Sequence, residues 1–156
     1  KWPNDVLVDL DTDQGGKVCG ILSERVDGPA GPHAVIGIGI NVSMGRDELP
    51  LPTATSLALC GLNHDKNELL ASLLIHLDEL LTVWLETGTV RDQYVARCDT
   101  IGTPVRLTFD PEIVGGGEGA IEGIGVDVDV DGAIVVETSD GRRSFNAADV
   151  HHLRTR

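Results

Sequence analysis

The alternation of apolar and polar residues divides the first third of the chain into strand-like segments. Residues 5–9 alternate apolar with polar side chains, and residues 17–26 and 33–42 are rich in Val and Ile. Clusters of Asp, Gly and Pro separate these runs. Short β-branched runs between turn-forming clusters are typical of strands. The pattern therefore predicts three neighbouring strands joined by tight turns.

A helical period follows the predicted strands. Leucines recur at steps of three and four residues over about 67–86, which predicts a long amphipathic helix. Residues 65–68 have the form of a capping box, and Gly88 provides a natural end. We expect the apolar stripe of this helix to face the protein core. Two shorter helices are predicted, one between Thr53 and Gly61 and one over about 90–98.

The remainder of the chain is rich in short β-type runs and turns. After residue 99, five such runs occur within some fifty residues, with Asp-Gly pairs as hairpin signals. This spacing suggests a small closed barrel. We therefore expect an α+β protein with two domains, a mixed sheet with helices over 1–100 and a β-barrel over 101–156.

Composition narrows the class of partner. The 156 residues hold 12 Lys and Arg against 25 Asp and Glu, a formal net charge of -13. Such a surface repels phosphate backbones and anionic lipids, so we expect neither nucleic-acid nor membrane binding by this segment. The three cysteines lack CxxC spacing, which favours buried, reduced thiols in the cytoplasm. We also expect the chain to begin inside a domain, because its first residue is not Met and adjoins a strand.

Three other motifs are better explained by structure than by ligand binding. Residues 127–132 copy the first half of an EF-hand loop, but position twelve is Thr138, so we expect a strand leading into a turn. Residues 37–42 lack the helix and final glycine of a dinucleotide fingerprint. The adjacent pair His151 and His152 points to opposite faces of a strand, and we expect both on the surface. No metal site is predicted.

The strongest chemical signal lies in the first 42 residues. Lysine occurs only three times, and Lys17 begins a strand in which Gly20 leaves the backbone bare for a ligand. An ammonium group beside open backbone can hold an anion. Asn4 and Asn41 add neutral hydrogen-bonding groups, and Asp5 can accept a proton, an amine or a metal ion. Each residue also has a purely structural explanation, as a turn cap, a solvated strand end or a strand terminator.

Four segments in order resemble the biotin protein ligase family. They are KWPNDVLVD at the start, KVCGIL at 17–22, GIGINV at 37–42 and DVHHLR at 149–154. The resemblance implies a catalytic domain related to class II aminoacyl-tRNA synthetases, followed by an SH3-like β-barrel. It further implies an ATP-dependent ligase that uses Mg²⁺ and converts biotin to biotinyl-5′-AMP. Such an enzyme then transfers biotin to a lysine of a biotin carboxyl carrier domain of acetyl-CoA carboxylase or a related carboxylase.

The resemblance also implies roles for individual residues. Lys17 matches the catalytic lysine that holds the biotin carboxylate against the α-phosphate, and Asp5 matches the aspartate that steers or deprotonates the carrier lysine. Arg154 matches a barrel residue that faces the catalytic domain. The remaining matches are biotin contacts at Gly20 and Ile21, and ATP contacts at Lys1, Trp2, Asn4, Gly39 and Asn41.

The chain departs from the family because the Gly-Arg-rich loop and the Ser-Thr biotin cradle, which should precede KWPND, do not occur in it. We therefore expect the C-terminal portion of a longer ligase, and the sequence leaves open whether this chain alone is active. The alternatives are a non-catalytic remnant or carrier-docking module, and a lipoyl or octanoyl transferase. The sequence leaves open whether the protein is a homodimer.

Overall fold

The computed structural model describes residues 1–8, 12–13, 15–109 and 120–153, which form two compact units. One unit contains Asn4–His76, and the other joins Lys1–Pro3 to the chain from Leu77 onward. The tripeptide at the start thus packs with the C-terminal part of the sequence. The expected domain boundary between residues 100 and 101 stays a prediction.

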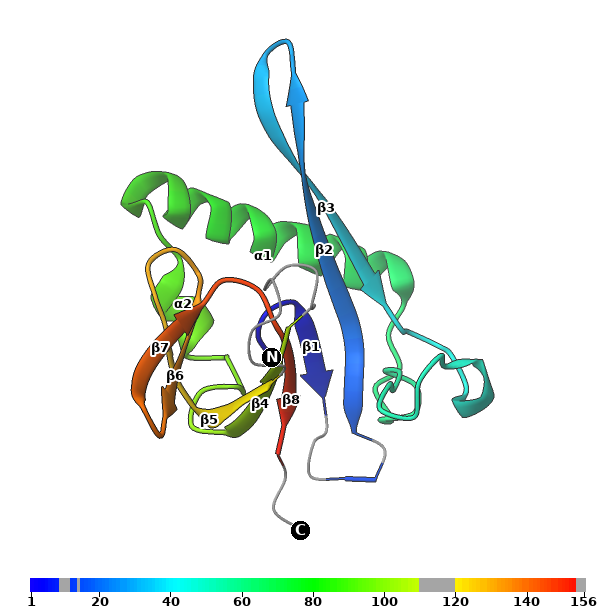
Figure 1. The fold of residues 1–156 in the computed structure, drawn as a ribbon. Coiled ribbons are helices and arrows are strands. Elements are labelled where there is room, and N and C mark those ends of the chain that lie inside the picture. The colour runs from blue at the N-terminus through cyan, green and yellow to red at the C-terminus, as the bar shows by residue number, and fades with distance from the viewer. Residues whose placement is uncertain (9–11, 14, 110–119, 154–156) are drawn as a thin grey trace. The chain divides into compact units, whose positions relative to one another are not determined.

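The unit of Asn4–His76 is built on an antiparallel sheet of three strands in the order β1-β2-β3. Its strands confirm the three that the β-branched runs predicted. The long β3 pairs along its whole length with residues 19–28 of β2, and the two form a twisted hairpin (Figure 1). The strands are β1 Asp5–Val8, β2 Gly16–Gly28 and β3 Gly31–Ile40.

The loop after β3 supports the start of β2 instead of forming the helix expected between Thr53 and Gly61. After the short 3-10 helix η1 (Arg46–Glu48), the chain returns to Lys17. The Lys17 amide donates to the Thr53 carbonyl at 2.9 Å, and the Thr55 amide donates to the Lys17 carbonyl at 2.8 Å. A helix over residues 53–61 would pair its own backbone groups internally. It would then leave the backbone amide and carbonyl of Lys17 without these partners. The expectation of a helix was wrong.

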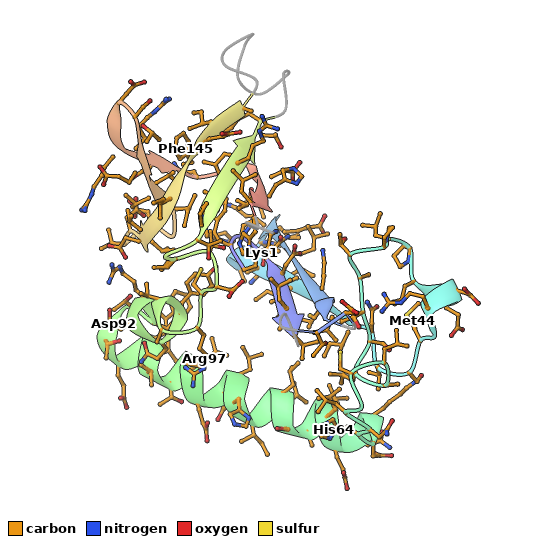
Figure 2. The ribbon with its side chains drawn as sticks, turned by 90° about the horizontal axis from the view of Figure 1, so that it is seen from below. Lys1, Met44, His64, Asp92, Arg97 and Phe145 are labelled. Atoms are coloured by element: carbon orange, nitrogen blue, oxygen red, sulfur yellow. The ribbon has the colours of Figure 1, made fainter. Side chains whose placement is uncertain are left out.

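Buried hydroxyl groups hold this returning loop. Thr55 and Ser56 are fully buried, and the Ser56 hydroxyl donates to the Met44 carbonyl at 2.7 Å while it accepts from the Leu59 amide at 3.2 Å. Figure 2 shows Met44 in the loop that precedes η1. A buried hydroxyl that both donates and accepts costs little to bury, so the segment has a defined position.

The predicted long helix is α1, Lys66–Thr87. The Asp65 carboxylate accepts hydrogen bonds from the amides of Asn67 at 2.8 Å and Glu68 at 3.2 Å, which satisfies two donors of the first turn. At the other end, Gly88 has φ +76°, a left-handed conformation that favours glycine. The start and the end of this helix were therefore readable from the sequence.

The apolar stripe of α1 is not a core face in this chain. None of its residues is buried, and the side chains of Trp84 and Leu85 are 52% and 81% exposed. Nothing in the described residues covers the stripe, so the expectation of a core face was wrong here. Among the described residues, no helix combines the length and apolar character needed to cross a membrane.

The C-terminal unit contains the short helix α2, Arg91–Val95, and a five-stranded antiparallel sheet of order β7-β6-β5-β4-β8. The five β-type runs all became strands, which confirms the α+β class. In the described residues the sheet is open, with β7 and β8 at its edges, so the closed barrel we expected is not formed by strand pairing. The strands are β4 Pro104–Thr108, β5 Ala120–Val128, β6 Ile134–Thr138, β7 Gly141–Phe145 and β8 Asp149–His152.

One face of this sheet forms the main hydrophobic core of the unit. Val105, Leu107, Ile134 and Val136 are fully buried, and Trp2 belongs to the same cluster. Phe145, seen on β7 in Figure 2, packs partly buried at its margin. Alternate residues of β4 and β6 point into this core, as the period of two in a strand requires.

The two candidate metal motifs of this unit have structural roles. The Asp129 carboxylate accepts hydrogen bonds from the Asp131 and Ala133 amides, which confirms a strand that leads into a turn. His151 is exposed, but the His152 side chain is only 10% exposed and bonds to the Thr100 hydroxyl at 3.2 Å. The expectation that both histidines lie on the surface was wrong for His152, because β8 turns that side chain toward residue 100.

Candidate functional site

Strand pairing places Asp5, Gly20 and Gly39 in one row across the three-stranded sheet. Asp5 on β1 is opposite Gly20 on β2, and Gly20 is opposite Gly39 on β3. Directly opposite residues of an antiparallel pair point to the same face. A carboxylate therefore stands at one end of a strip whose other two positions carry no side chain.

The Lys17 side chain reaches this row from a position near the start of β2. The register of β1 and β2 shifts between Val6 and Leu7, where Leu7 pairs with Lys17. The Lys17 ammonium lies 2.6 Å from the Asp5 carboxylate, and the two side chains are 41% and 15% exposed. Because the ammonium end of the pair is partly open to solvent, the pair contributes about 1 kcal/mol, and an anion can compete with Asp5 for the ammonium group.

Gly20 leaves room for the lysine side chain. A β-carbon added at Gly20 would lie 3.3 Å from both Cε and Nζ of Lys17. The same addition at Gly39 would meet only a backbone oxygen, at 3.9 Å. The end of Lys17 thus lies over bare backbone on β2, and the neighbouring position on β3, Gly39, also carries no side chain. This arrangement can bind an anion through the ammonium group and a planar group against the glycines.

Both asparagines are held by backbone carbonyls. The Asn4 side-chain amide donates to the Ile21 carbonyl at 2.8 Å, and that of Asn41 donates to the Thr55 carbonyl at 3.0 Å. Because each nitrogen is engaged in this way, the position of each side-chain oxygen is fixed. Thr55 also pairs with the Lys17 backbone, so Asn41 and Lys17 are connected through one residue.

Cys19 adjoins the charged pair but lacks the character of a nucleophile. Burial raises the pKa of its thiol, an effect that Lys17 partly opposes and Asp5 reinforces. The thiol therefore stays neutral at pH 7, whereas the thiolate is the reactive form. Cys19, Cys60 and Cys98 form no disulfide. Cys19 and Cys98 are buried as expected, whereas Cys60 is only partly buried.

The other expected site residues are distributed differently. Ile21 pairs with Ile38 on the opposite face from Gly20, so only its backbone adjoins the row. Lys1 and Trp2 belong to the C-terminal unit, and Trp2 is 3% exposed. Arg154 lies outside the described residues. The predicted biotin and ATP contacts of these residues stay predictions.

Sequence reasoning missed residues that shape this site. Gly37 pairs with Leu22 and shares the face of Gly20 and Gly39, which extends the bare strip by one position. The period of two in a strand signals this, since Gly37 and Gly39 are two residues apart. Thr55 and Ser56 had no comparable signal, because their role depends on a contact with Lys17 that is remote in sequence.

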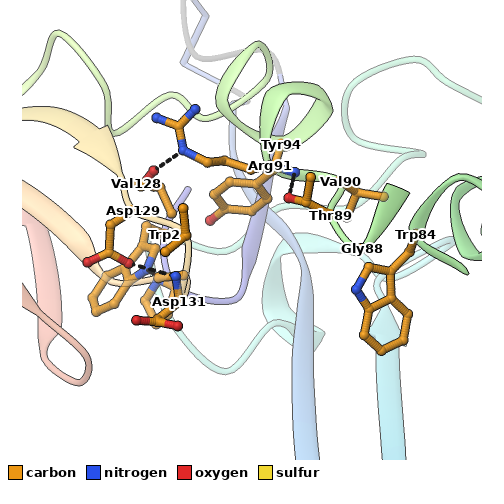
Figure 3. Close-up of a pocket in the computed structure, with 13 residues that line it drawn as sticks. Trp2, Trp84, Gly88, Thr89, Val90, Arg91, Tyr94, Val128, Asp129 and Asp131 are labelled. Carbon is orange, nitrogen blue, oxygen red and sulfur yellow. Dashed lines mark hydrogen bonds between the residues drawn. The ribbon is translucent and has the colours of Figure 1, made fainter. Parts of the chain in front are cut away.

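A separate cavity of about 450 Å³ opens in the C-terminal unit. It includes Trp2, Trp84, Tyr94 and Asp131, and none of Asp5, Lys17, Gly20 or Asn41 (Figure 3). Arg91 on its wall is neutralised, because its guanidinium bonds to Asp127 at 2.5 and 2.7 Å. In the described residues no group of three His, Cys, Asp or Glu side chains is arranged to hold a metal ion. The charged row on the sheet remains the candidate site.

Comparison with known proteins agrees with these features. Residues 1–41 match the model of the biotin/lipoate A/B protein ligase family, and residues 100–153 match the biotin protein ligase C-terminal domain. The biotin–[acetyl-CoA-carboxylase] ligase of Mycobacterium tuberculosis is 36% identical over 156 residues, which are 99% of this chain and 53% of that protein. The corresponding ligase of Paracoccus denitrificans is 31% identical, over 96% of this chain and 61% of that protein.

Solved structures show the same likeness. The Aquifex aeolicus biotin protein ligase in complex with biotin and ATP is 26% identical, with a TM-score of 0.69. The match covers 99% of this chain and 61% of that one. The chain thus spans about half the length of the curated relatives it matches. Two family models, the similar ligases and the shared fold agree, and the chain belongs to the biotin protein ligase family.

Proposed function

We propose that this chain is part of an ATP-dependent ligase that activates biotin and transfers it to a lysine of a carrier domain. The observation that carries the proposal is the Lys17 ammonium, 2.6 Å from Asp5 and above the bare backbone of Gly20. The similar proteins named as biotin–[acetyl-CoA-carboxylase] ligases, and the relative solved with biotin and ATP, support this choice of substrates.

In the first step the biotin carboxylate attacks the α-phosphorus of ATP, and pyrophosphate leaves. Two anions must approach each other, and negative charge grows on the phosphate oxygens. A fixed cation stabilises that arrangement more than it stabilises the separate reactants. Lys17 is suited to this role, because its ammonium adjoins open backbone and its pairing with Asp5 is weak enough to exchange.

In the second step the carrier lysine attacks the acyl carbon of biotinyl-5′-AMP, and AMP leaves. The attacking amine must be neutral and must lose a further proton as the amide forms. Asp5 lies beside Lys17 and is mostly covered, with 15% of its side chain exposed. We assign it to orienting the amine and receiving that proton, once the adenylate occupies Lys17.

The remaining components follow from the same proposal. Mg²⁺ enters with the phosphates of ATP, because this ion is usually held by substrate phosphates and one or two carboxylates. The acceptor is the carrier domain of acetyl-CoA carboxylase or a related carboxylase. Three cysteines that form no disulfide, together with the use of ATP, suit a cytoplasmic enzyme.

We expect substitution of Lys17 by alanine to lower biotin-dependent exchange between ATP and pyrophosphate by about 10²–10³-fold, the effect typical of losing a transition-state charge partner. The measurement uses the full-length gene product. Lys66→Ala, which removes an exposed lysine at the start of α1, is the matched control and should retain wild-type exchange. Equal activity of the two variants would refute the assigned role of Lys17.

Substitution of Gly20 by alanine should displace the lysine without harming the fold. The new β-carbon would lie 3.3 Å from Cε and Nζ, closer than a relaxed contact, and the flexible amine has to move. We expect kcat/KM for exchange to fall by about tenfold, or about 1.4 kcal/mol, with Tm unchanged. Ser23→Ala on the exposed part of β2 is the control. Normal exchange in the Gly20 variant would show that the position of the amine is unimportant.

The two steps should respond differently to Asp5→Asn. Loss of this partly exposed ion pair should change adenylate formation by about fivefold or less, since the pair contributes about 1 kcal/mol. Loss of the proton acceptor should slow transfer to the carrier lysine by about 10²-fold. Pyrophosphate exchange and single-turnover transfer from preformed adenylate measure the two steps. A parallel loss in both assays would contradict the separate role of Asp5.

The chain matches only about half the length of the Mycobacterium tuberculosis ligase. This favours a second interpretation, in which these 156 residues alone supply only part of the site. We expect titration calorimetry to detect no micromolar binding of biotin or ATP by this chain, and to detect it with the full-length gene product. Lipoate and octanoate, offered in place of biotin, should not replace it. Micromolar binding by the short chain would exclude the remnant interpretation, and turnover of lipoate would favour the transferase.

A further inference from the structure

Three successive backbone carbonyls in the loop after β3, those of residues 53–55, each accept a hydrogen bond from a defined donor. Two of the donors are candidate site residues, through the backbone amide of Lys17 and the side-chain amide of Asn41. The third donor is Arg46, whose guanidinium bonds to the middle carbonyl at 2.8 Å. Donors and acceptors all belong to the unit of Asn4–His76, so the arrangement lies within one unit.

The middle carbonyl, that of Ala54, points away from β2. Ala54 forms a parallel β-bridge with Lys17, and the Lys17 amide and carbonyl bond to the residues on either side of it. Backbone groups of successive residues in a strand point to opposite edges, so the amide and carbonyl of Ala54 point to the outer edge. There the amide bonds to the Leu51 carbonyl at 3.0 Å, and the carbonyl meets Arg46. Lys17 and Arg46 therefore hold the segment from its two edges.

The segment packs closely against the start of β2. A β-carbon added at Gly16 would overlap the Thr53 carbonyl oxygen, and Ala54 is only 4% exposed. Close-packed groups transmit a displacement to their neighbours. A shift of the segment must therefore move the backbone of Lys17 or break the two hydrogen bonds that join them. Either change would alter where the Lys17 ammonium lies relative to Gly20.

The hydrogen bond from Arg46 is well suited to prevent such a shift. Hydrogen bonds from a charged donor are roughly twice as strong as those between neutral groups. The Arg46 side chain is exposed, so removal of its guanidinium leaves no cavity in the core. The effect of losing Arg46 should thus be confined to the segment that it holds.

We infer that Arg46 is a positioning residue for Lys17, because it holds residues 53–55 against the start of β2. This inference rests on the function proposed above and adds a residue to the same site. Arg46 needs no contact with biotin or ATP in this role. It acts on the backbone from which the Lys17 ammonium extends.

Arg46→Met tests the inference in the full-length gene product, because it keeps an unbranched stem and removes the donor. We expect kcat/KM for biotin-dependent pyrophosphate exchange to fall by about tenfold. Arg25→Met is the matched control, since it makes the same change at an exposed arginine of the β2–β3 hairpin, which pairs with Asp27. The control should retain wild-type exchange. Equal activity of the two variants would overturn the inference.

A double-mutant cycle separates positioning from a direct contact with substrate. If Arg46 acts through Lys17, Arg46→Met should cost less than about twofold once Lys17 is already alanine, because no ammonium remains to be placed. Independent contributions multiply instead. A further loss of about tenfold in the double variant would show that Arg46 acts on its own, and the positioning role would be excluded.

Amide hydrogen exchange reports on the contact itself and does not depend on activity. The amides of Lys17 and Thr55 join the segment to β2, and both should exchange faster in Arg46→Met than in wild type or Arg25→Met. Amides elsewhere in the β2–β3 hairpin should keep their rates. Unchanged exchange at the two amides, or a uniform rise throughout the hairpin, would contradict the inference.

The outcomes separate the inference from the proposed function. If the wild-type protein shows no biotin-dependent exchange between ATP and pyrophosphate, the function fails, and hydrogen exchange still decides whether Arg46 holds the segment. If the wild-type protein is active and Arg46→Met matches it in both assays, the function stands and Arg46 has no positioning role.

Discussion

The pairing of β1 with β2 is the constraint on which the candidate site depends. It places Asp5 opposite Gly20, and the register shift one step along allows Lys17 to reach the same carboxylate. A strand reverses the direction of its side chains at every residue, so a slip by one position would send Asp5 to the other face. Charge and bare backbone meet only in the observed register.

A segment remote in sequence stabilises that register. The loop at 53–56 pairs with the backbone of Lys17 and is itself held by buried hydroxyl groups. The lysine side chain is long and flexible, so these backbone constraints decide where its ammonium can be. The weak ion pair with Asp5 then sets the direction of the side chain without locking it.

The parts of the fold that were predictable are those with local causes. The period of two and the Asp-Gly turns identified the strands, and Asp65 and Gly88 marked the ends of α1 because caps act within one turn. The segment after Thr53 was predicted wrongly, since its backbone hydrogen bonds go to Lys17, far away in sequence. The pairing of His152 with Thr100 has the same cause. Long-range pairing overrides local propensity, and one sequence does not reveal it.

The candidate site residues stood out in the sequence for a different reason. Lys17 stood out because lysine is rare in this chain, and Gly20 because a bare position in a strand suggests close approach of a ligand. The burial of Trp2 had no such signal, since a tryptophan beside a strand suits a ligand contact as well as a core. The apolar stripe of α1 was read correctly as helical and wrongly as buried. Burial depends on what packs against a helix, and the described residues place nothing on that stripe.

The net charge of -13 explains why a local cation matters so much here. At long range the acidic surface repels ATP, but salt screens that field over about 8 Å at physiological ionic strength. Within the site, close to low-dielectric protein, the attraction of a single ammonium is screened far less. Lysine rather than arginine suits the task, because its compact charge on a flexible stem can leave Asp5 and follow the phosphate as the bond forms. Under the proposed function, an acidic protein binds a triphosphate through one lysine, and the pairing of β1, β2 and the loop at 53–56 fixes the backbone from which Lys17 extends.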